Sequence, residues 1–170
     1  MEFIEEALKL DEKQELFWFI QLYNDRMKRR NSEHILLKEN DSNRKMVSLR
    51  EVDSIKEEAI DGKCVVLDLT TSDYYFYGIN DAVKLEQKQA EMLGYLIDHQ
   101  MRTCSKSGIE KAIWLNQGVG KTTVRRYISA IRVKLTQAMG RNDISENILV
   151  TANGGYVWRA DIVAKVLRKG

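Results

Sequence analysis

Six residues in the middle of the chain have the composition of a loop that binds a nucleotide. The stretch Gly-Val-Gly-Lys-Thr-Thr covers residues 118–123. In a phosphate-binding loop, glycines let the backbone wrap the phosphates and the lysine reaches their oxygens. That pattern requires a glycine five positions before Gly120, where this chain has Leu115. A buried strand must also lead into the loop, whereas the residues before it have helical periodicity. The sequence therefore favours a turn between two helices, with nucleotide hydrolysis as the weaker alternative.

The residues after this turn predict a helix, at about residues 122–138, with two chemically different faces. Apolar side chains recur at i, i+4, i+7 and i+11 and turn one face towards a core; they are Val124, Ile128, Ile131 and Leu135. The other face carries polar and basic side chains, namely Thr122, Arg125, Arg126, Ser129 and Arg132 beside Val133, with Lys121 and Thr123 near the helix start. Arginine can pair with guanine through two hydrogen bonds, and hydroxyl groups can bond bases or phosphates. This face is therefore suited to the major groove of DNA.

Charge is distributed unevenly along the chain. Residues 1–60 have a net charge of −3, and residues 61–170 have a net charge of +5. No acidic residue lies between Lys111 and Asn142, whereas seven lysine and arginine residues do. A stripe of one sign favours a polyanionic partner, and the alternative is a solvated basic face without a partner.

The first 47 residues are predicted to be a helical extension and a connector, separate from a domain that covers residues 48–170. Between residues 2 and 30, apolar residues recur every three or four positions, as in amphipathic helices that are too short to form a core alone. We expect these helices to pack on the rest of the chain, to dimerise, or to dock on another protein. Residues 31–47 are polar, with one short strand expected at residues 35–37.

The domain that follows is predicted to mix helices and strands. Ser48 and Glu51 have the spacing of a capping box and predict a helix to about residue 60. Residues 63–85 are rich in β-branched and aromatic residues and predict three short antiparallel strands. Helical periodicity returns after residue 85 and again at about residues 106–115, ahead of the basic helix.

Near the end of the sequence, two extended runs flank Asn153 and Gly154, which is a strong signal for a hairpin. Residues 162–169 are expected to add a short helix. The order of elements predicts an α+β fold with an N-terminal antiparallel sheet, three helices and a C-terminal hairpin, preceded by the helical extension.

Residues 63–160 resemble the winged helix-turn-helix DNA-binding domain of the OmpR/PhoB family of bacterial transcription regulators, including its ToxR/CadC-like branch. The similarity lies in the three strands, in LEQKQAEMLGYLI for the first helix, in Trp114 at the end of the second, in TTVRRYISAIRVKL for the third, and in ILVTANGGYVW for the wing. The resemblance implies that the third helix reads the major groove and that the hairpin lies beside it as the wing. Together with the helix pattern it gives a candidate DNA-binding set: Lys121, Thr122, Thr123, Arg125, Arg126, Tyr127, Ser129, Arg132, Lys134, Asn153 and Arg159.

Three features depart from the family pattern. Wings of the family usually carry an arginine where this chain has Ala152, so Asn153 and Arg159 are the candidates for wing contacts. Glu86 replaces the usual threonine at the start of the first helix. The phosphorylated receiver domain of the family does not fit into the first 60 residues, and none is expected. Trp114 and Tyr156 are expected to serve packing.

The sequence thus predicts a DNA-binding transcriptional regulator. The alternative is an adaptor that does not bind DNA and uses a winged-helix scaffold to hold another regulatory protein. Expected partners are double-stranded DNA, a second copy or a regulatory protein bound through residues 2–30, and RNA polymerase.

Other chemistry has little support in the sequence. No enzymatic activity, cofactor or metal site is expected, because His34 and His99 are isolated and Cys64 and Cys104 lack the spacing of metal ligands. No apolar run is long enough to span a membrane, so a cytoplasmic location with reduced cysteines is expected.

Overall fold

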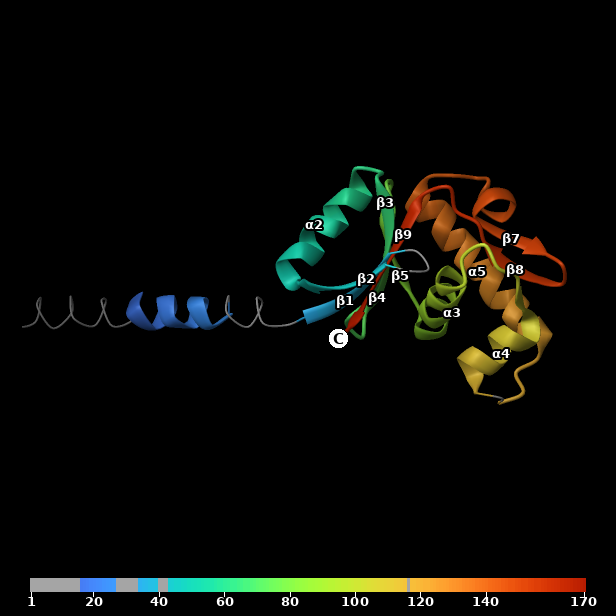
Figure 1. Cartoon of the computed structure of the whole chain (residues 1–170), viewed down its shortest axis with the longest axis horizontal. Coiled ribbons are helices and arrows are strands. Elements are labelled where there is room, and N and C mark those ends of the chain that lie inside the picture. Colours follow the sequence, from blue (N-terminus) through green and yellow to red (C-terminus); the bar gives the residue numbers. More distant parts are fainter. Residues whose placement is uncertain (1–15, 27–33, 40–42, 116) are drawn as a thin grey trace, which may run out of the picture.

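The computed structural model describes residues 16–26, 34–39, 43–115 and 117–170 (Figure 1). Residues 16–26 form a helix, and the other described residues form two sheets, four α-helices and one short π-helix, η1 (Ile144–Ile148). Within these ranges, no helix combines the length and the apolar character needed to cross a bilayer. What the sequence predicted for residues 1–15, 27–33 and 40–42 lies outside the described residues.

The larger sheet has six strands in the order β2-β1-β9-β3-β4-β5. Its strands are β1 (His34–Glu39), β2 (Asn43–Ser48), β3 (Cys64–Leu69), β4 (Tyr74–Tyr77), β5 (Ala82–Leu85) and β9 (Val163–Lys169). The pair β3–β9 is parallel, and every other pair in this sheet is antiparallel. The three predicted strands at residues 63–85 are therefore confirmed as β3, β4 and β5.

Helices cover both faces of this sheet (Figure 1). α2 (Leu49–Ile60) lies on one face, and α3 (Gln87–Asp98) and α5 (Lys121–Met139) lie on the other, with α4 (Lys106–Trp114) beside them. Successive side chains of a strand point to opposite faces. Accordingly, Cys64 and Val66 of β3 join the core under α2, whereas Val65 and Leu67 join the larger core with α3 and α5.

The start of α2 follows the predicted capping box. The Ser48 backbone N–H donates to Glu51 Oε2 at 2.7 Å, and the Glu51 N–H donates to Ser48 Oγ at 3.4 Å. Val52, Ile55 and Ala59 are buried at the spacing of one helical face. The helix predicted after residue 48 is thus confirmed.

A second, three-stranded sheet has the order β6-β8-β7. It consists of β7 (Leu149–Ala152), β8 (Gly155–Trp158) and the two-residue strand β6 (Cys104–Ser105). β7 and β8 form the predicted hairpin, and Asn153 and Gly154 both have positive φ, 49° and 77°, as a tight two-residue turn requires. The predicted α+β order of sheet, three helices and hairpin is confirmed.

Two segments differ from the sequence-based expectation. Residues 162–169 were expected to be helical, but residues 163–169 form strand β9. Their intrinsic preference is overridden because β9 pairs with β1 on one side and β3 on the other, and it buries Ala164, Val166 and Leu167.

The second difference concerns the predicted connector. Residues 34–39 and 43–48 form a hairpin that joins the large sheet through β9, although only one short strand at residues 35–37 was expected. Ile35, Leu37 and Val47 are buried in the core under α2. The boundary placed after residue 47 therefore falls inside this sheet rather than in a linker.

Candidate nucleic-acid interface

α5 presents a buried face and a solvent face, as its sequence pattern requires. Val124, Ile128, Ile131 and Leu135 are at most 1% exposed and contact the main core. On the opposite side, the exposed residues are Thr122, Arg125, Arg126, Ser129 and Val133. Lys121 is exposed at the first turn, whereas Lys134 is half-buried near the other end. Most of the predicted contact residues on this helix thus share one accessible face.

The turn before α5 is not a phosphate-binding loop. It follows helix α4 rather than a strand, and its backbone has positive φ at Leu115 (49°), Gly118 (67°) and Gly120 (82°). The Gly120 N–H, at the start of α5, donates to Glu110 Oε1 at 3.3 Å. Thr123 is half-buried, and its hydroxyl donates to the Val119 carbonyl at 2.8 Å. These contacts fix the angle between α4 and α5, which confirms the predicted turn between two helices.

The C-terminal end of α5 is held by the turn between β4 and β5. The backbone N–H groups of Asn80 and Asp81 donate to the Ala138 carbonyl at 2.9 and 3.1 Å, and Asn80 Nδ2 donates to the Gln137 carbonyl at 3.0 Å. Carbonyls at a helix end lack partners within the helix, so these donors satisfy two of them. A Cβ atom at Gly78 would lie 2.3 Å from the Ala138 carbonyl oxygen. Only glycine at position 78 therefore allows the β4–β5 turn to lie this close to the end of α5.

Arg132 points from α5 to the wing. Its Nε and Nη2 donate to the Leu149 carbonyl at 3.0 and 2.8 Å, and Nη2 also donates to Thr151 Oγ1 at 2.9 Å. The guanidinium lies 5.8 Å from the centre of the Tyr156 ring. Burial lowers the pKa of Arg132 from its ordinary value, and the nearby Tyr156 opposes that shift. Arg132 was predicted as a DNA contact, but its hydrogen bonds position β7 against α5.

We expect Arg132→Lys to lower the free energy of unfolding by about 1–2 kcal/mol, because an ammonium cannot reproduce the forked contact with Leu149 and Thr151. Thermal denaturation of the full chain measures this change. Arg126→Lys is the matched control, because it makes the same substitution on the exposed face and should leave stability unchanged. Equal stabilities of the two variants would show that Arg132 does not hold the wing.

Arg141, the last cation of the predicted basic stripe, is paired with carboxylates in the structure. Arg141 pairs with Asp143 at 2.7 Å and with Asp161 at 2.9 Å. Hydrogen bonds to these two carboxylates raise the pKa of Arg141, and the Arg141 guanidinium in turn holds the pKa of Asp143 well below its ordinary value. In the part of the chain that the structure describes, Lys121, Arg125 and Arg126 have no carboxylate partner.

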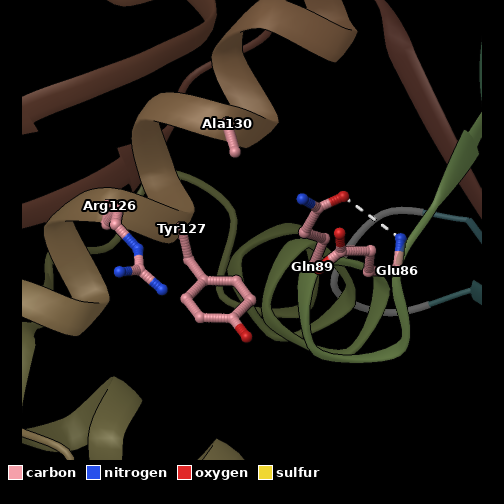
Figure 2. A pocket seen from close by; sticks show the side chains of 5 residues that line it. All are labelled: Glu86, Gln89, Arg126, Tyr127 and Ala130. Atoms are coloured by element: carbon pink, nitrogen blue, oxygen red, sulfur yellow. Dashed lines mark hydrogen bonds between the residues drawn. The ribbon is translucent and has the colours of Figure 1, made fainter.

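A shallow hollow of about 200 Å³ lies between α5 and the start of α3 (Figure 2). It is lined by Glu86, Gln89, Arg126, Tyr127 and Ala130. The Glu86 N–H donates to Gln89 Oε1 at 3.1 Å, so the first turn of α3 is fixed. Figure 2 shows the Tyr127 side chain between Arg126 on one side and Glu86 and Gln89, at the start of α3, on the other. The sequence did not predict this hollow, because it joins positions about 40 residues apart.

The aromatic residues around α5 are held by packing. Tyr127 is half-buried, and its ring meets that of Trp114 edge to face at 5.3 Å between centroids. Trp114 and Tyr156 are 6% and 3% exposed, which confirms the packing role that the sequence predicted for them. Tyr127 therefore lines the hollow and also packs against Trp114 at the end of α4.

At the wing, Asn153 and Gly154 are exposed at the tip, and Ala152 pairs with Gly155 just below it. Arg159 is exposed directly after β8, and its backbone N–H donates to the Ile148 carbonyl at 2.7 Å. Both predicted wing residues are thus accessible, one at the tip and one at the base. Among the described residues, no group of three or more histidine, cysteine, aspartate or glutamate side chains could hold a metal ion.

Comparison with known families identifies this arrangement. Residues 80–158 match the family described as "Transcriptional regulatory protein, C terminal". The match covers 79 of the 170 residues, and this part of the chain is similar to that family. The matched residues run from the β4–β5 turn to the end of β8 and include α3, α4, α5 and the wing. Together they form a winged helix-turn-helix, the regulator domain of this chain, and the chain is a DNA-binding regulator of transcription.

Several solved structures are similar to the chain. The C-terminal domain of the nisin resistance regulator NsrR, a lantibiotic response regulator, is 20% identical, with a TM-score of 0.42 over 54% of this chain and 89% of that one. The DNA-binding domain of the response regulator AdeR, in complex with an intercistronic region, is 20% identical, with a TM-score of 0.46 over 58% and 96%. The DNA-binding domain of E. coli CadC is 13% identical, with a TM-score of 0.45 over 75% and 94%. None of the curated proteins compared with the sequence matches it.

Proposed function

We propose that the regulator domain inserts α5 into the major groove of duplex DNA and reads bases with Arg125, Arg126 and Ser129. One observation carries this proposal: these side chains lie together on an exposed face, and neither arginine has a carboxylate partner among the described residues. Guanidinium groups in this position can make two hydrogen bonds to guanine.

Phosphate contacts would set the position of α5 in the groove. Lys121 and Thr122 lie at the helix N-terminus, where the helix dipole favours an anion. Thr123 supports this end through its bond to Val119, and Lys134 lies farther along the helix. Across the hollow, Arg126 and Tyr127 form a polar wall that suits the DNA backbone, and Glu86 opposite them limits how closely a phosphate can approach.

The wing is proposed to contact the DNA backbone beside the groove that α5 occupies, through Asn153 and Arg159. Ala152 cannot replace the cation that the family has there, so the wing of this chain contributes less to affinity than α5 does. Arg132 is assigned to positioning of the wing and not to direct contact with DNA.

The helices within residues 2–30 are proposed to bind a second copy or another regulatory protein, as a unit distinct from the regulator domain. RNA polymerase is the further partner of a regulator of this kind. We propose no catalytic activity and, because the ligand is chromosomal DNA, a place in the cytoplasm.

Selection of bound sequences from random duplexes, with the full chain, tests the proposed function. We expect enrichment of a short motif, with affinity that falls steeply as salt rises because each phosphate contact releases counterions. An adaptor that binds no DNA predicts no enrichment at any salt concentration. That outcome, with the chain folded by circular dichroism, would overturn the proposal.

A further inference from the structure

The hollow between α3 and α5 contains a hydrogen-bond donor that the described part of the chain does not satisfy. Gln89 is 6% exposed, and its Oε1 accepts from the Glu86 N–H at 3.1 Å. A carboxamide has its acceptor on one side and its donor on the other, so this bond directs Nε2 away from the Glu86 N–H. Figure 2 shows the Gln89 nitrogen on the side of α5. Among the described residues, Nε2 has no hydrogen-bond partner.

The surroundings of Gln89 favour an anion as the missing acceptor. A donor on a side chain this deeply buried is costly to leave unpaired. Gln89 lies in the first turn of α3, where the backbone N–H groups and the helix dipole give a positive potential. Arg126 and Tyr127 line the hollow from α5 and add a guanidinium and a phenolic hydroxyl. The hollow is thus lined with donors from two helices, which suits the oxygens of a phosphate.

Glu86 opposes an anion at the same place. It is exposed and lines the same hollow, so its carboxylate repels a phosphate that approaches Gln89. The start of α3 therefore combines a donor that attracts a phosphate with a charge that limits how tightly the phosphate is held.

We propose that Gln89 donates to a backbone phosphate of the DNA duplex, which makes the start of α3 a second DNA-contacting element beside α5. Glu86 is then the residue that limits the strength of this contact. The inference rests on the proposed function, because a DNA strand reaches the hollow only when α5 lies in the major groove. A phosphate held between α3 and α5 fixes the register of α5 along the groove.

Gln89→Glu tests the donor with a change of one atom. A carboxylate keeps an oxygen for the Glu86 N–H, so the start of α3 is preserved, but it replaces Nε2 by an anionic oxygen. We expect the full chain to bind the duplex enriched by the selection experiment about 10-fold more weakly, and by the same factor for all DNA sequences. Asn43→Asp is the matched control, because it makes the same amide-to-carboxylate change on β2, at the opposite edge of the large sheet from β5, and should bind as the wild type does.

Glu86→Gln should have the opposite effect. Removal of the carboxylate from the hollow should strengthen binding by about 2- to 5-fold, again for all DNA sequences, because a phosphate is no longer repelled. If Glu86 and Gln89 contacted the edge of a base instead, the effect of each substitution would depend on the base, and the proposal would be wrong.

Neutral methylphosphonate linkages, placed at one position of the duplex at a time, locate the contact. At one position the linkage should weaken binding of the wild-type chain, because it removes an attraction to Gln89. At the same position it should strengthen binding of Gln89→Glu, because it removes a repulsion between two anions. A residue that only supports the fold would not produce this change of sign, so the absence of any such position would overturn the proposal.

Two further measurements separate the remaining explanations. Calorimetric titration of the free chain with inorganic phosphate should show no saturable binding at millimolar concentration; saturable binding would make the hollow a site for a free anion and overturn the assignment to DNA. If Arg125→Ala weakens DNA binding and Gln89→Glu does not, only the role of Gln89 is wrong. If neither variant changes DNA binding, the proposed function fails as well.

Discussion

Arg125→Ala is expected to weaken binding to the duplex enriched by the selection experiment about 5- to 150-fold. This factor corresponds to a loss of about 1–3 kcal/mol of binding free energy from one contact with a base. Arg125 is exposed on the face of α5 opposite the core, so truncation should leave the fold intact. The variant should also lose discrimination at one base position, because a lost base contact, unlike a lost phosphate contact, depends on sequence. Titration of the cognate duplex and of single-base variants measures both effects.

Two lysine or arginine substitutions serve as comparisons for Arg125→Ala. Lys134→Ala should reduce the affinity by the same factor for all DNA sequences. It should also reduce the steepness of the plot of log affinity against log salt concentration by about one. Arg50→Ala removes the same charge from an exposed position of α2, on the other side of the large sheet, and should have little effect. If all three variants bind as the wild type does, α5 does not read DNA.

Gly78→Ala is expected to destabilise the chain by about 3 kcal/mol or more, because its methyl group would overlap backbone atoms that cannot move aside cheaply. The new Cβ would lie 2.3 Å from the Ala138 carbonyl oxygen and 2.6 Å from its carbon. Relief of this overlap would pull the β4–β5 turn away from α5 and break the two bonds to Ala138. Urea denaturation of the full chain measures the loss.

The control for Gly78→Ala is Gly94→Ala in the middle of α3. Its Cβ would meet Arg168 and Leu69 at 3.4 Å, which is close to ordinary contact, and glycine within a helix costs about 1 kcal/mol relative to alanine. We expect Gly94→Ala to be neutral or stabilising. Similar losses for both variants would show that the effect at Gly78 does not come from the contact with Ala138.

Features specified by nearby residues were predictable from the sequence. The buried face of α5 follows from the spacing of four apolar residues, and the start of α2 follows from Ser48 and Glu51. The wing turn follows from Asn153 and Gly154, since few other residues accept positive φ at two successive positions. In each case the interaction that decides the structure joins residues that lie close together in the chain.

Features decided by distant residues could not be predicted in the same way. Arg132 resembles its neighbours Arg125 and Arg126 in sequence, and only the approach of Leu149 shows that its guanidinium holds the wing. In the sequence Arg141 is one of the cations of the basic stripe, and only the structure shows that Asp161 pairs with it. Both arginines thus have partners within the chain, and neither contact follows a pattern that periodicity could reveal.

The same reason explains the strand at residues 163–169. Apolar and polar side chains alternate only imperfectly in this segment. Its conformation is set by pairing with β1 and β3, which lie about 100 or more residues earlier in the chain. The polar segment at residues 34–48 likewise becomes a hairpin because β9 offers it an edge to pair with.

The position of β9 also has a consequence for the order of folding. β1 and β3 do not pair with each other, so the β1–β2 hairpin is attached to the large sheet only through β9. The hairpin is made early in synthesis, but its place in the sheet exists only after residues 163–169 have been made. Contacts between residues so far apart in sequence form slowly. During synthesis the β1–β2 hairpin must therefore remain without its partner strand while the whole regulator domain is completed.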